Sequence, residues 1–291
     1  MSEYVLFTDS CADYDSKMVA ELGIEVMNLT FQIGDSSYEN KPDWAEMAPE
    51  VFYGRLRGGE VSSTSQINVS EFEAAFRKVL AEGKDVLYAG FSSALSGTLN
   101  SASVAAEELR GEFKDRKIVV VDTQAASLGQ GLLVWYAAKM KKDGKSLEEV
   151  AAWLEENKLK LAHWFTVDDL NFLKRGGRVS GASALLGTLL NIKPILHVDN
   201  AGKLIPVGKV RGRRTSLDTL LAHMKETAVN PADQTVFISH GDSLEDAQYL
   251  AEQIKKELGV KEIYINYVGP VIGSHSGPGT MALFFMATTR D

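Results

Sequence analysis

The segment DVLYAGFSSALSGT, residues 85–98, joins an apolar run to a turn rich in small hydroxyl residues. The run Asp85–Ala89 is typical of a buried strand, and Gly90 ends it. From Thr98 to Leu109, apolar residues recur at three- and four-residue spacing, which indicates a helix. A strand, a polar turn and a helix in this order form the repeating unit of a parallel α/β sheet.

The same unit recurs along the first half of the chain. The expected strands are Tyr4–Thr8, Ile24–Leu29, Asp85–Ala89 and Lys117–Val121. The expected helices are Ser16–Leu22, Asp43–Leu56, Val69–Leu80, Thr98–Leu109, Gly131–Lys141 and a helix with a capping-box signature that begins at Ser146 and ends near Glu156. This alternation predicts an α/β fold whose N-terminal domain, residues 1–157, has a parallel sheet with helices on both faces.

The second half has a different pattern. Its expected strands are Leu161–Val167, Ile195–Val198, Leu204–Val210, Thr235–Ser239, Glu262–Val268 and Met281–Ala287, and its expected helices are Ser216–Thr227 and Leu244–Leu258. The turn 199–202, DNAG, joins two of these strands directly and predicts an antiparallel hairpin. Residues 158–291 are therefore expected to form an α+β domain with a mixed sheet covered mainly on one side.

The composition of the chain disfavours several classes of protein. The 291 residues are 45% apolar and 24% charged, as in globular proteins, and the net charge of −8 disfavours binding to nucleic acid or to anionic membranes. No apolar run approaches the roughly 20 residues of a membrane span. The single cysteine, Cys11, cannot form an intrachain disulfide, and the N-terminus lacks the pattern of a signal peptide. We expect a cytoplasmic protein without stable membrane insertion.

Polar loops follow several of the predicted strands. They are Thr8-Asp9-Ser10, the serine-rich loop of residues 92–98, Asp122-Thr123 and His240-Gly241-Asp242, and residues 62–66, SSTSQ, are expected in a further loop. Each hydroxyl taken alone is most simply a helix N-cap. Because the carboxyl ends of parallel strands share one edge of a sheet, the loops together predict a small site for a carboxylate or phosphate.

The segment 174–214 is strongly basic. It contains nine lysines and arginines against one acid, Asp199, so it carries +8 while the rest of the chain carries −16. A solvated basic face is one interpretation, and arginines that face a phosphate or an acidic protein surface are the other. Residues 184–190, ALLGTLL, are expected either in the core or along a tunnel for an apolar ligand.

Two other functions remain open from the residues alone. Residues 90–94, GFSSA, resemble a nucleophile elbow, and Asp242 and His275 follow in the order of a serine hydrolase that would act from Ser92 or Ser96 on a small ester or acyl substrate. A phosphosugar- or nucleotide-binding enzyme could use the same loops. No Walker-type loop occurs, residues 277–282 fit a dinucleotide fingerprint poorly, and the scattered histidines predict no metal site.

Several motifs occur in the order and spacing of the DegV family, and together they span essentially the whole chain. They are Thr8-Asp9-Ser10, Thr64-Ser65-Gln66, the loop of residues 92–98, Gly176-Gly177-Arg178-Val179-Ser180, Lys193-Pro194-Ile195, Lys209-Val210-Arg211 and the segment from Gly269-Pro270-Val271 to His275. The chain therefore resembles the DegV proteins, which are bacterial fatty-acid-binding proteins with two α/β domains.

The resemblance implies a non-catalytic role without a cofactor. The protein would bind a long-chain fatty acid and present its carboxylate to a separate ATP-dependent fatty acid kinase subunit, and an acyltransferase downstream would use the acyl phosphate for phospholipid synthesis. By motif, Thr64 and Ser96 would hold the carboxyl group, with Ser93 in the same loop, and His275 would complete their hydrogen-bond network. Arg178 and Arg211 match basic positions associated with the phosphoryl end and the kinase surface.

Overall fold

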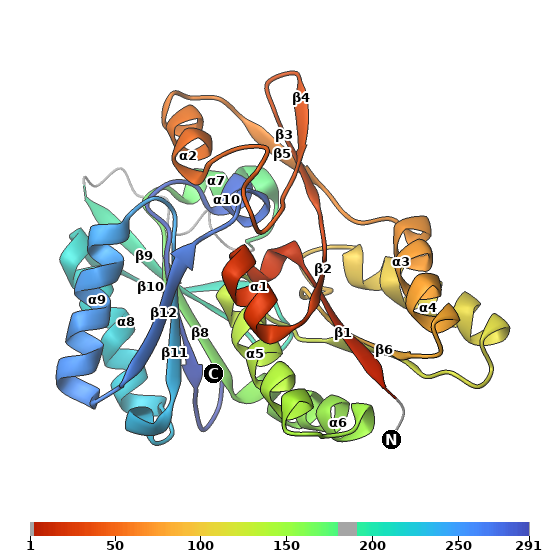
Figure 1. Ribbon diagram of the computed structural model, residues 1–291. Helices are drawn as coiled ribbons and strands as arrows, with labels where there is room; N and C mark the ends of the chain where they lie inside the picture. Colours follow the sequence, from red (N-terminus) through yellow and green to blue (C-terminus); the bar gives the residue numbers. More distant parts are fainter. Residues whose placement is uncertain (1–2, 180–190, 291) are drawn as a thin grey trace.

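The computed structural model describes residues 3–179 and 191–290, which form two large sheets separated by helices (Figure 1). The first sheet has the strand order β2-β1-β6-β7, and all of its neighbours are parallel. Its strands are β1 (Tyr4–Asp9), β2 (Glu25–Met27), β6 (Asp85–Gly90) and β7 (Ile118–Asp122). The predicted parallel sheet of the first half is confirmed.

Helices cover both faces of this sheet. On one side lie α3 (Val69–Ala81) and α4 (Thr98–Glu112), and on the other lie α1 (Ser16–Leu22), α5 (Leu128–Lys142) and α6 (Leu147–Asn157) (Figure 1). Capping boxes with Asn68 and Ser146 satisfy backbone amides at the start of α3 and α6. These local signals explain why the boundaries of both helices follow from the sequence.

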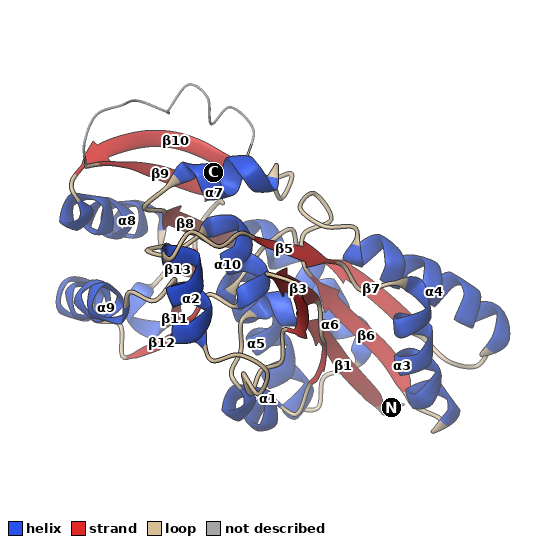
Figure 2. Cartoon of the chain, turned by 90° about the horizontal axis from the view of Figure 1, so that it is seen from above, coloured by secondary structure: helices blue, strands red, loops and turns tan. Residues whose placement is uncertain are grey.

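The second sheet is mixed, with the order β10-β9-β8-β13-β11-β12. Its strands are β8 (Leu161–Thr166), β9 (Ile192–Val198), β10 (Leu204–Arg211), β11 (Thr235–His240), β12 (Glu262–Tyr267) and β13 (Met281–Met286). Only β11 and β12 pair in parallel, and the predicted hairpin joins β9 to β10. On its outer face lie α8 (Arg213–Thr227) and α9 (Leu244–Leu258), at the opposite side of the molecule from α3 and α4 (Figure 2).

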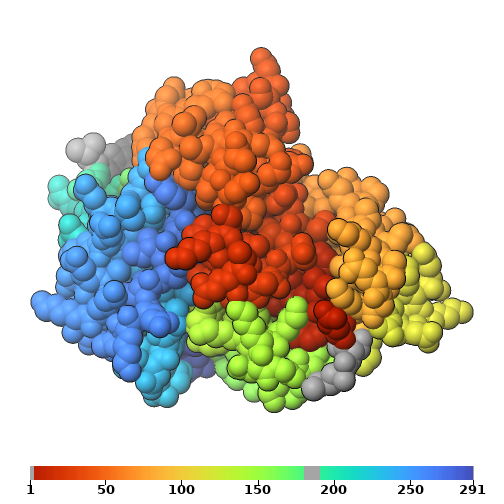
Figure 3. All heavy atoms as spheres, viewed as in Figure 1, coloured from red at the N-terminus to blue at the C-terminus, as the bar shows by residue number. Residues whose placement is uncertain are grey.

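The inner face of the mixed sheet is covered by α5, so the expectation of a sheet covered mainly on one side is wrong. Most of α5 is buried, and its apolar residues point in all directions around the helix, as is typical of a helix enclosed by other elements. One hydrophobic core includes Leu6 of β1, Leu132 of α5 and Phe284 of β13. On the face drawn in Figure 3, residues of the first and second halves meet along a continuous surface.

A third, antiparallel sheet lies beside the two large ones. It has the order β4-β3-β5, with β3 at Thr30–Ile33, β4 at Ser36–Glu39 and β5 at Ser62–Ser65. Residues 62–65, predicted to be in a loop, therefore form a strand. The sequence does not show this strand, because four consecutive hydroxyl residues lack the alternation of apolar and polar residues that predicts one. Pairing with β3 gives these residues their extended conformation.

Short helices complete the fold. Next to β5 lies α10 (Pro270–Ser276), which packs against α7 (Leu170–Gly176) and α2 (Pro49–Arg57). The helix α2 begins at Pro49, later than the sequence predicts. Single 3-10 turns are η1 (Ser10–Ala12), η2 (Lys158–Lys160) and η4 (Pro231–Asp233). The sequence analysis predicts neither α7 nor α10.

The basic segment is partly neutralised by acids from other parts of the chain. Lys193 lies 2.5 Å from a carboxylate oxygen of Asp168, and Arg213 lies 2.8 Å from Asp246. The segment is therefore not a uniformly solvated basic face. Residues 184–190, for which the sequence predicts a core or tunnel position, lie outside the described residues.

Candidate functional site

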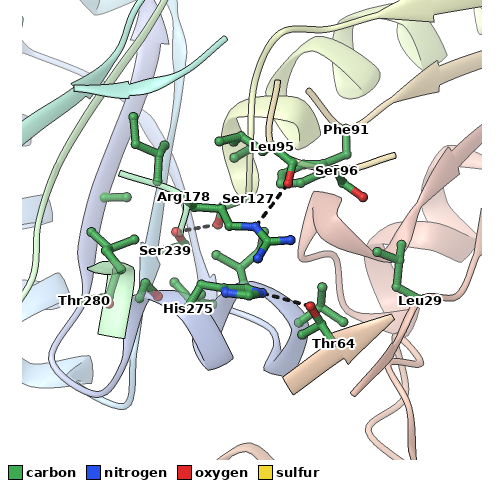
Figure 4. A pocket seen from close by; sticks show the side chains of 18 of the residues that line it. Leu29, Thr64, Phe91, Leu95, Ser96, Ser127, Arg178, Ser239, His275 and Thr280 are labelled. Carbon is green, nitrogen blue, oxygen red and sulfur yellow. Dashed lines mark hydrogen bonds between the residues drawn. The ribbon is translucent and has the colours of Figure 1, made fainter. Parts of the chain in front are cut away.

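A cavity of about 380 Å³ lies where the three sheets meet (Figure 4). Its volume falls within the range of small-molecule sites, roughly 300–1,000 Å³. Apolar side chains from both halves of the chain line it, among them Leu29, Phe91, Phe165, Leu173 and Val271. Such a lining suits a ligand with a large apolar part.

The polar residues that line the cavity fall into two groups by burial. Those that remain partly or fully exposed are Thr64, Ser65, Gln66, Ser96, Arg178 and His275, and they mark the mouth of the cavity. Those that are buried are Ser127, His163, Ser239, Ser276 and Thr280, and they line its interior. The mouth therefore combines hydroxyl groups, an imidazole and one guanidinium. These groups can donate hydrogen bonds to a carboxylate, and the guanidinium can balance its charge.

Thr64 and His275 meet at the mouth although they are far apart in the sequence. Thr64 lies on β5 and His275 on α10, and the Thr64 hydroxyl oxygen is 2.8 Å from Nε2 of His275. A β-carbon on Gly176 would lie 2.3 Å from Nδ1 of His275, so only glycine leaves room for the ring at this position. The Thr64 hydroxyl and the His275 imidazole are therefore held in direct hydrogen-bond contact.

His275 is neutral at physiological pH. Burial lowers its pKa to about 4, and the nearby charge of Arg178 lowers it further in the same direction. In the tautomer with its proton on Nε2, the ring donates to Thr64, which leaves the hydroxyl hydrogen of Thr64 for an oxygen of a ligand. A carboxylate is the ligand that this arrangement and the adjacent guanidinium would favour.

Ser96 reaches the same mouth from the loop between β6 and α4. Its hydroxyl oxygen accepts the backbone N–H of Thr98 at 3.2 Å, at the start of α4. A β-carbon on Gly97 would lie 2.2 Å from the side-chain oxygen of Gln66, so the loop packs closely against the segment that carries Thr64. The positive end of the α4 dipole at this point also favours an anion.

The other predicted site residues lie in different places relative to the cavity. The Ser93 hydroxyl donates to the carboxylate of Asp122 at 2.5 Å, and Ser93 is not among the residues that line the cavity. Arg178 lines the mouth, where its Nε donates to the Leu95 carbonyl at 3.3 Å, whereas Arg211 is exposed at the end of β10, outside the lining. Ser93, predicted to bind the ligand, therefore does not line this cavity. The two arginines, predicted to share one role, lie in different places, with only Arg178 in the lining.

The residues of the alternative serine hydrolase are not assembled. The Ser92 hydroxyl is buried and donates to the Gly202 carbonyl at 2.8 Å. Asp242 pairs with Arg57, and His275 bonds Thr64. Ser96, the other expected nucleophile, lines the same mouth as His275, but its hydroxyl oxygen lies 3.0 Å from that of Thr98. This chemistry needs a nucleophile, a base and an orienting acid in mutual contact, and Asp242 pairs with Arg57 instead of His275.

Other features of the described residues bear on metal, thiol and membrane chemistry. Residues 3–179 and 191–290 contain no group of three or more His, Cys, Asp or Glu side chains placed to hold a metal ion. Over the same ranges, no helix has both the length and the apolar character needed to span a bilayer. Cys11 is buried, and burial, followed by the charges of Asp9 and Asp13, raises the pKa of its thiol well above the usual range.

Comparisons with known proteins identify the family and agree with this fold. A family model described as "Uncharacterised protein, DegV family" matches residues 4–288. A DegV domain-containing protein of Clostridium perfringens is 50% identical over 291 residues, which is all of both chains. The chain therefore belongs to the DegV family, as its sequence motifs indicate.

Solved structures of relatives have the same fold. A DegV family protein of Thermus thermophilus, described for its fatty acid binding, superposes with a TM-score of 0.86 at 34% identity, covering 99% of this chain and 100% of the other. A Thermotoga maritima protein described as revealing a fatty acid binding function gives a TM-score of 0.84 at 30% identity with the same coverage. The predicted α/β fold with a parallel and a mixed sheet is confirmed.

Proposed function

We propose that this protein binds a long-chain fatty acid in the cavity and presents its carboxylate to a separate kinase in the cytoplasm. The observation that carries the proposal is the hydrogen-bonded pair Thr64–His275 at the mouth of one apolar cavity. The two structural relatives that bind fatty acids support it. The division between residues 1–157 and 158–291 fits such a site, because both parts contribute to its lining.

The tail and the head group have different tasks in this proposal. Burying about 14 methylene groups at ~0.8 kcal/mol each provides roughly 11 kcal/mol before the costs of association. Thr64 and Ser96 then donate hydrogen bonds to the carboxylate, and Arg178 balances its charge. Because the tail supplies most of the binding free energy, the mouth serves mainly to direct one carboxylate oxygen outward.

Phosphoryl transfer would complete the proposed function. The carboxylate oxygen forms a bond to the γ-phosphorus of ATP held by the kinase, and the bond from that phosphorus to the leaving oxygen of ADP breaks. The chain has no Walker-type loop, which suits a carrier whose partner supplies ATP. The acyl phosphate would then pass to an acyltransferase that feeds phospholipid synthesis.

Native mass spectrometry of the purified protein tests the binding step. We expect a mass increase equal to one long-chain fatty acid, and organic extraction should release the acid and return the protein to its unliganded mass. The tail makes the complex stable enough to survive purification. An empty protein, or one that carries a nucleotide or phosphosugar, would contradict the proposal.

The two arginines should differ in what they affect. We expect Arg178→Ala to weaken fatty acid binding about tenfold or more, because a hydrogen bond to a charged group contributes roughly 1.5–3 kcal/mol. Arg211→Ala should leave binding unchanged and reduce phosphoryl transfer, with a weaker salt dependence than the wild type, because one screened charge on the kinase-facing surface is lost. A fatty acid titration and a reconstituted kinase assay at two salt concentrations measure both effects. Equal losses of binding in both variants would place Arg211 in the acyl site instead.

A further inference from the structure

The interior of the cavity contains a polar cluster that carboxylate binding at the mouth does not use. Ser127 and Ser239 are buried, line the cavity, and have hydroxyl oxygens 2.9 Å apart (Figure 4). The Ser127 hydroxyl also bonds the buried carboxyl group of Asp13. An unsubstituted acyl chain offers no partner to such groups, and burying them carries a desolvation cost.

The backbone holds Ser127 in an unusual conformation. Its φ of 54° and ψ of −147° belong to a region that glycine enters readily and serine rarely does. Asp13, at the other end of the hydrogen bond, also has a positive φ of 53°. A glycine at position 127 would relax the backbone, so the presence of serine indicates that its hydroxyl group is needed.

Two more polar atoms of the cavity wall have no hydrogen-bond partner among the described residues. They are Nδ1 of His163 and the hydroxyl oxygen of Ser276, and the two residues are 4% and 5% exposed. Buried polar atoms in native proteins nearly always have a partner. On the wall of a binding cavity, a polar atom of the ligand can supply such a partner.

The cluster can present a hydrogen-bond acceptor to the cavity. The Ser127 hydroxyl donates to a carboxyl oxygen of Asp13, whose pKa burial raises to about 8. Because the hydrogen of Ser127 is used in this bond, Ser127 accepts from Ser239. Since Ser239 bonds only Ser127 within residues 3–179 and 191–290, a lone pair of its hydroxyl oxygen is left to accept a hydrogen from a ligand hydroxyl group.

We propose that the cavity accepts an acyl chain with a hydroxyl substituent, and that Ser239 accepts the hydrogen of this hydroxyl group in the interior. The proposal rests on the proposed function, because the carboxylate at the mouth sets the direction of the chain. A substituent at the matching position along the chain meets the polar cluster, and one elsewhere meets apolar wall and loses its hydrogen bonds to water.

Titration with matched acids tests this substrate class. The probes are stearate and a series of hydroxystearates with the hydroxyl group at different positions. We expect one hydroxystearate to bind the wild type about threefold to tenfold more tightly than stearate, which is the effect of one neutral hydrogen bond. In Ser239→Ala this preference should disappear, while stearate affinity stays within about twofold because no contact of the tail or carboxylate is lost.

Two further variants make the result independent of folding defects. Ser127→Gly removes the hydroxyl group that orients Ser239 and should reduce the preference, while the relief of the positive φ offsets part of the cost of the two buried hydrogen bonds that are lost. Ser216→Ala removes an equally buried hydroxyl, which donates to the Arg213 carbonyl outside the cavity, and should keep the preference.

The outcomes separate this inference from the proposed function. If stearate binds and every hydroxystearate binds more weakly to the wild type, the cluster holds only water and the inference is overturned. Equal weakening of both acids by Ser239→Ala would also overturn it. If neither acid binds the wild type, the proposed function fails as well.

Discussion

Removing the two hydroxyl groups at the mouth, in the variant Thr64→Ala/Ser96→Ala, should weaken fatty acid binding by a hundredfold or more. In the proposed complex each hydroxyl would donate one hydrogen bond to a charged carboxylate, and such a bond contributes roughly 1.5–3 kcal/mol, or about tenfold to a hundredfold in affinity. Acyl phosphate formation should fall at least as much, because the reacting oxygen is no longer held in one direction. A fatty acid titration and a reconstituted kinase assay measure the two losses.

Conservative variants and an uncharged ligand control this experiment. Thr64→Ser keeps a hydroxyl at the same position and should retain most of the affinity. The methyl ester of the same acid has no carboxylate, so its weaker binding should differ little between the wild type and the double variant. Because Ser96 also accepts the Thr98 N–H at the start of α4, its loss should lower the free energy of unfolding by about 1 kcal/mol. Wild-type kinase turnover in the double variant would remove both residues from the site.

Replacing Asp13 by asparagine should stabilise the protein at neutral pH and flatten its stability profile. Burial, the larger cause, and the nearby charge of Asp9 raise the pKa of Asp13 from 3.8 to about 8, against hydrogen bonds from Ser127 and the Gly269 N–H. Between these two pH values the folded state keeps the proton and the unfolded state loses it. The free energy of unfolding therefore falls as pH rises, by about 1.4 kcal/mol per pH unit.

The Asp13→Asn variant stays uncharged in both states and lacks this slope. At pH 7 we expect it to be more stable than the wild type by on the order of 3 kcal/mol. Denaturant unfolding at a series of pH values measures the difference, and Asp115→Asn, which changes an exposed carboxylate, serves as the control. Parallel profiles for the wild type and Asp13→Asn would show that Asp13 is ionised in the folded protein.

Local signals in the sequence were enough for most elements of the two large sheets. Apolar runs bounded by glycine or polar turns define strands such as β6, and capping boxes define the starts of α3 and α6. The DNAG turn defines the hairpin between β9 and β10. Each of these features depends on residues close together in the chain, and for that reason the sequence alone predicts it.

The motifs of the sequence also pointed to Thr64, Ser96 and His275, and the structure brings all three to one cavity. The sequence does not predict Ser127, His163 or Ser239 as lining residues. Ser127 follows the polar turn after β7, and Ser239 lies near the carboxyl end of β11. Closeness to the carboxyl end of a strand was therefore the only sequence signal that could have marked them as lining residues. That signal could not distinguish a lining residue from a helix cap.

The amino-acid sequence by itself determined most strands and helices of the two large sheets, the hairpin, the acidic net charge and the family. The tertiary structure decided that SSTS is a strand, that α5 lies between two sheets, and that Thr64 meets His275 across 211 positions of the chain. It also placed Asp13, Ser127 and Ser239 in one buried cluster. The physical reason is that periodicity and turn chemistry act over a few residues, whereas contacts between distant residues follow from how the apolar faces pack together.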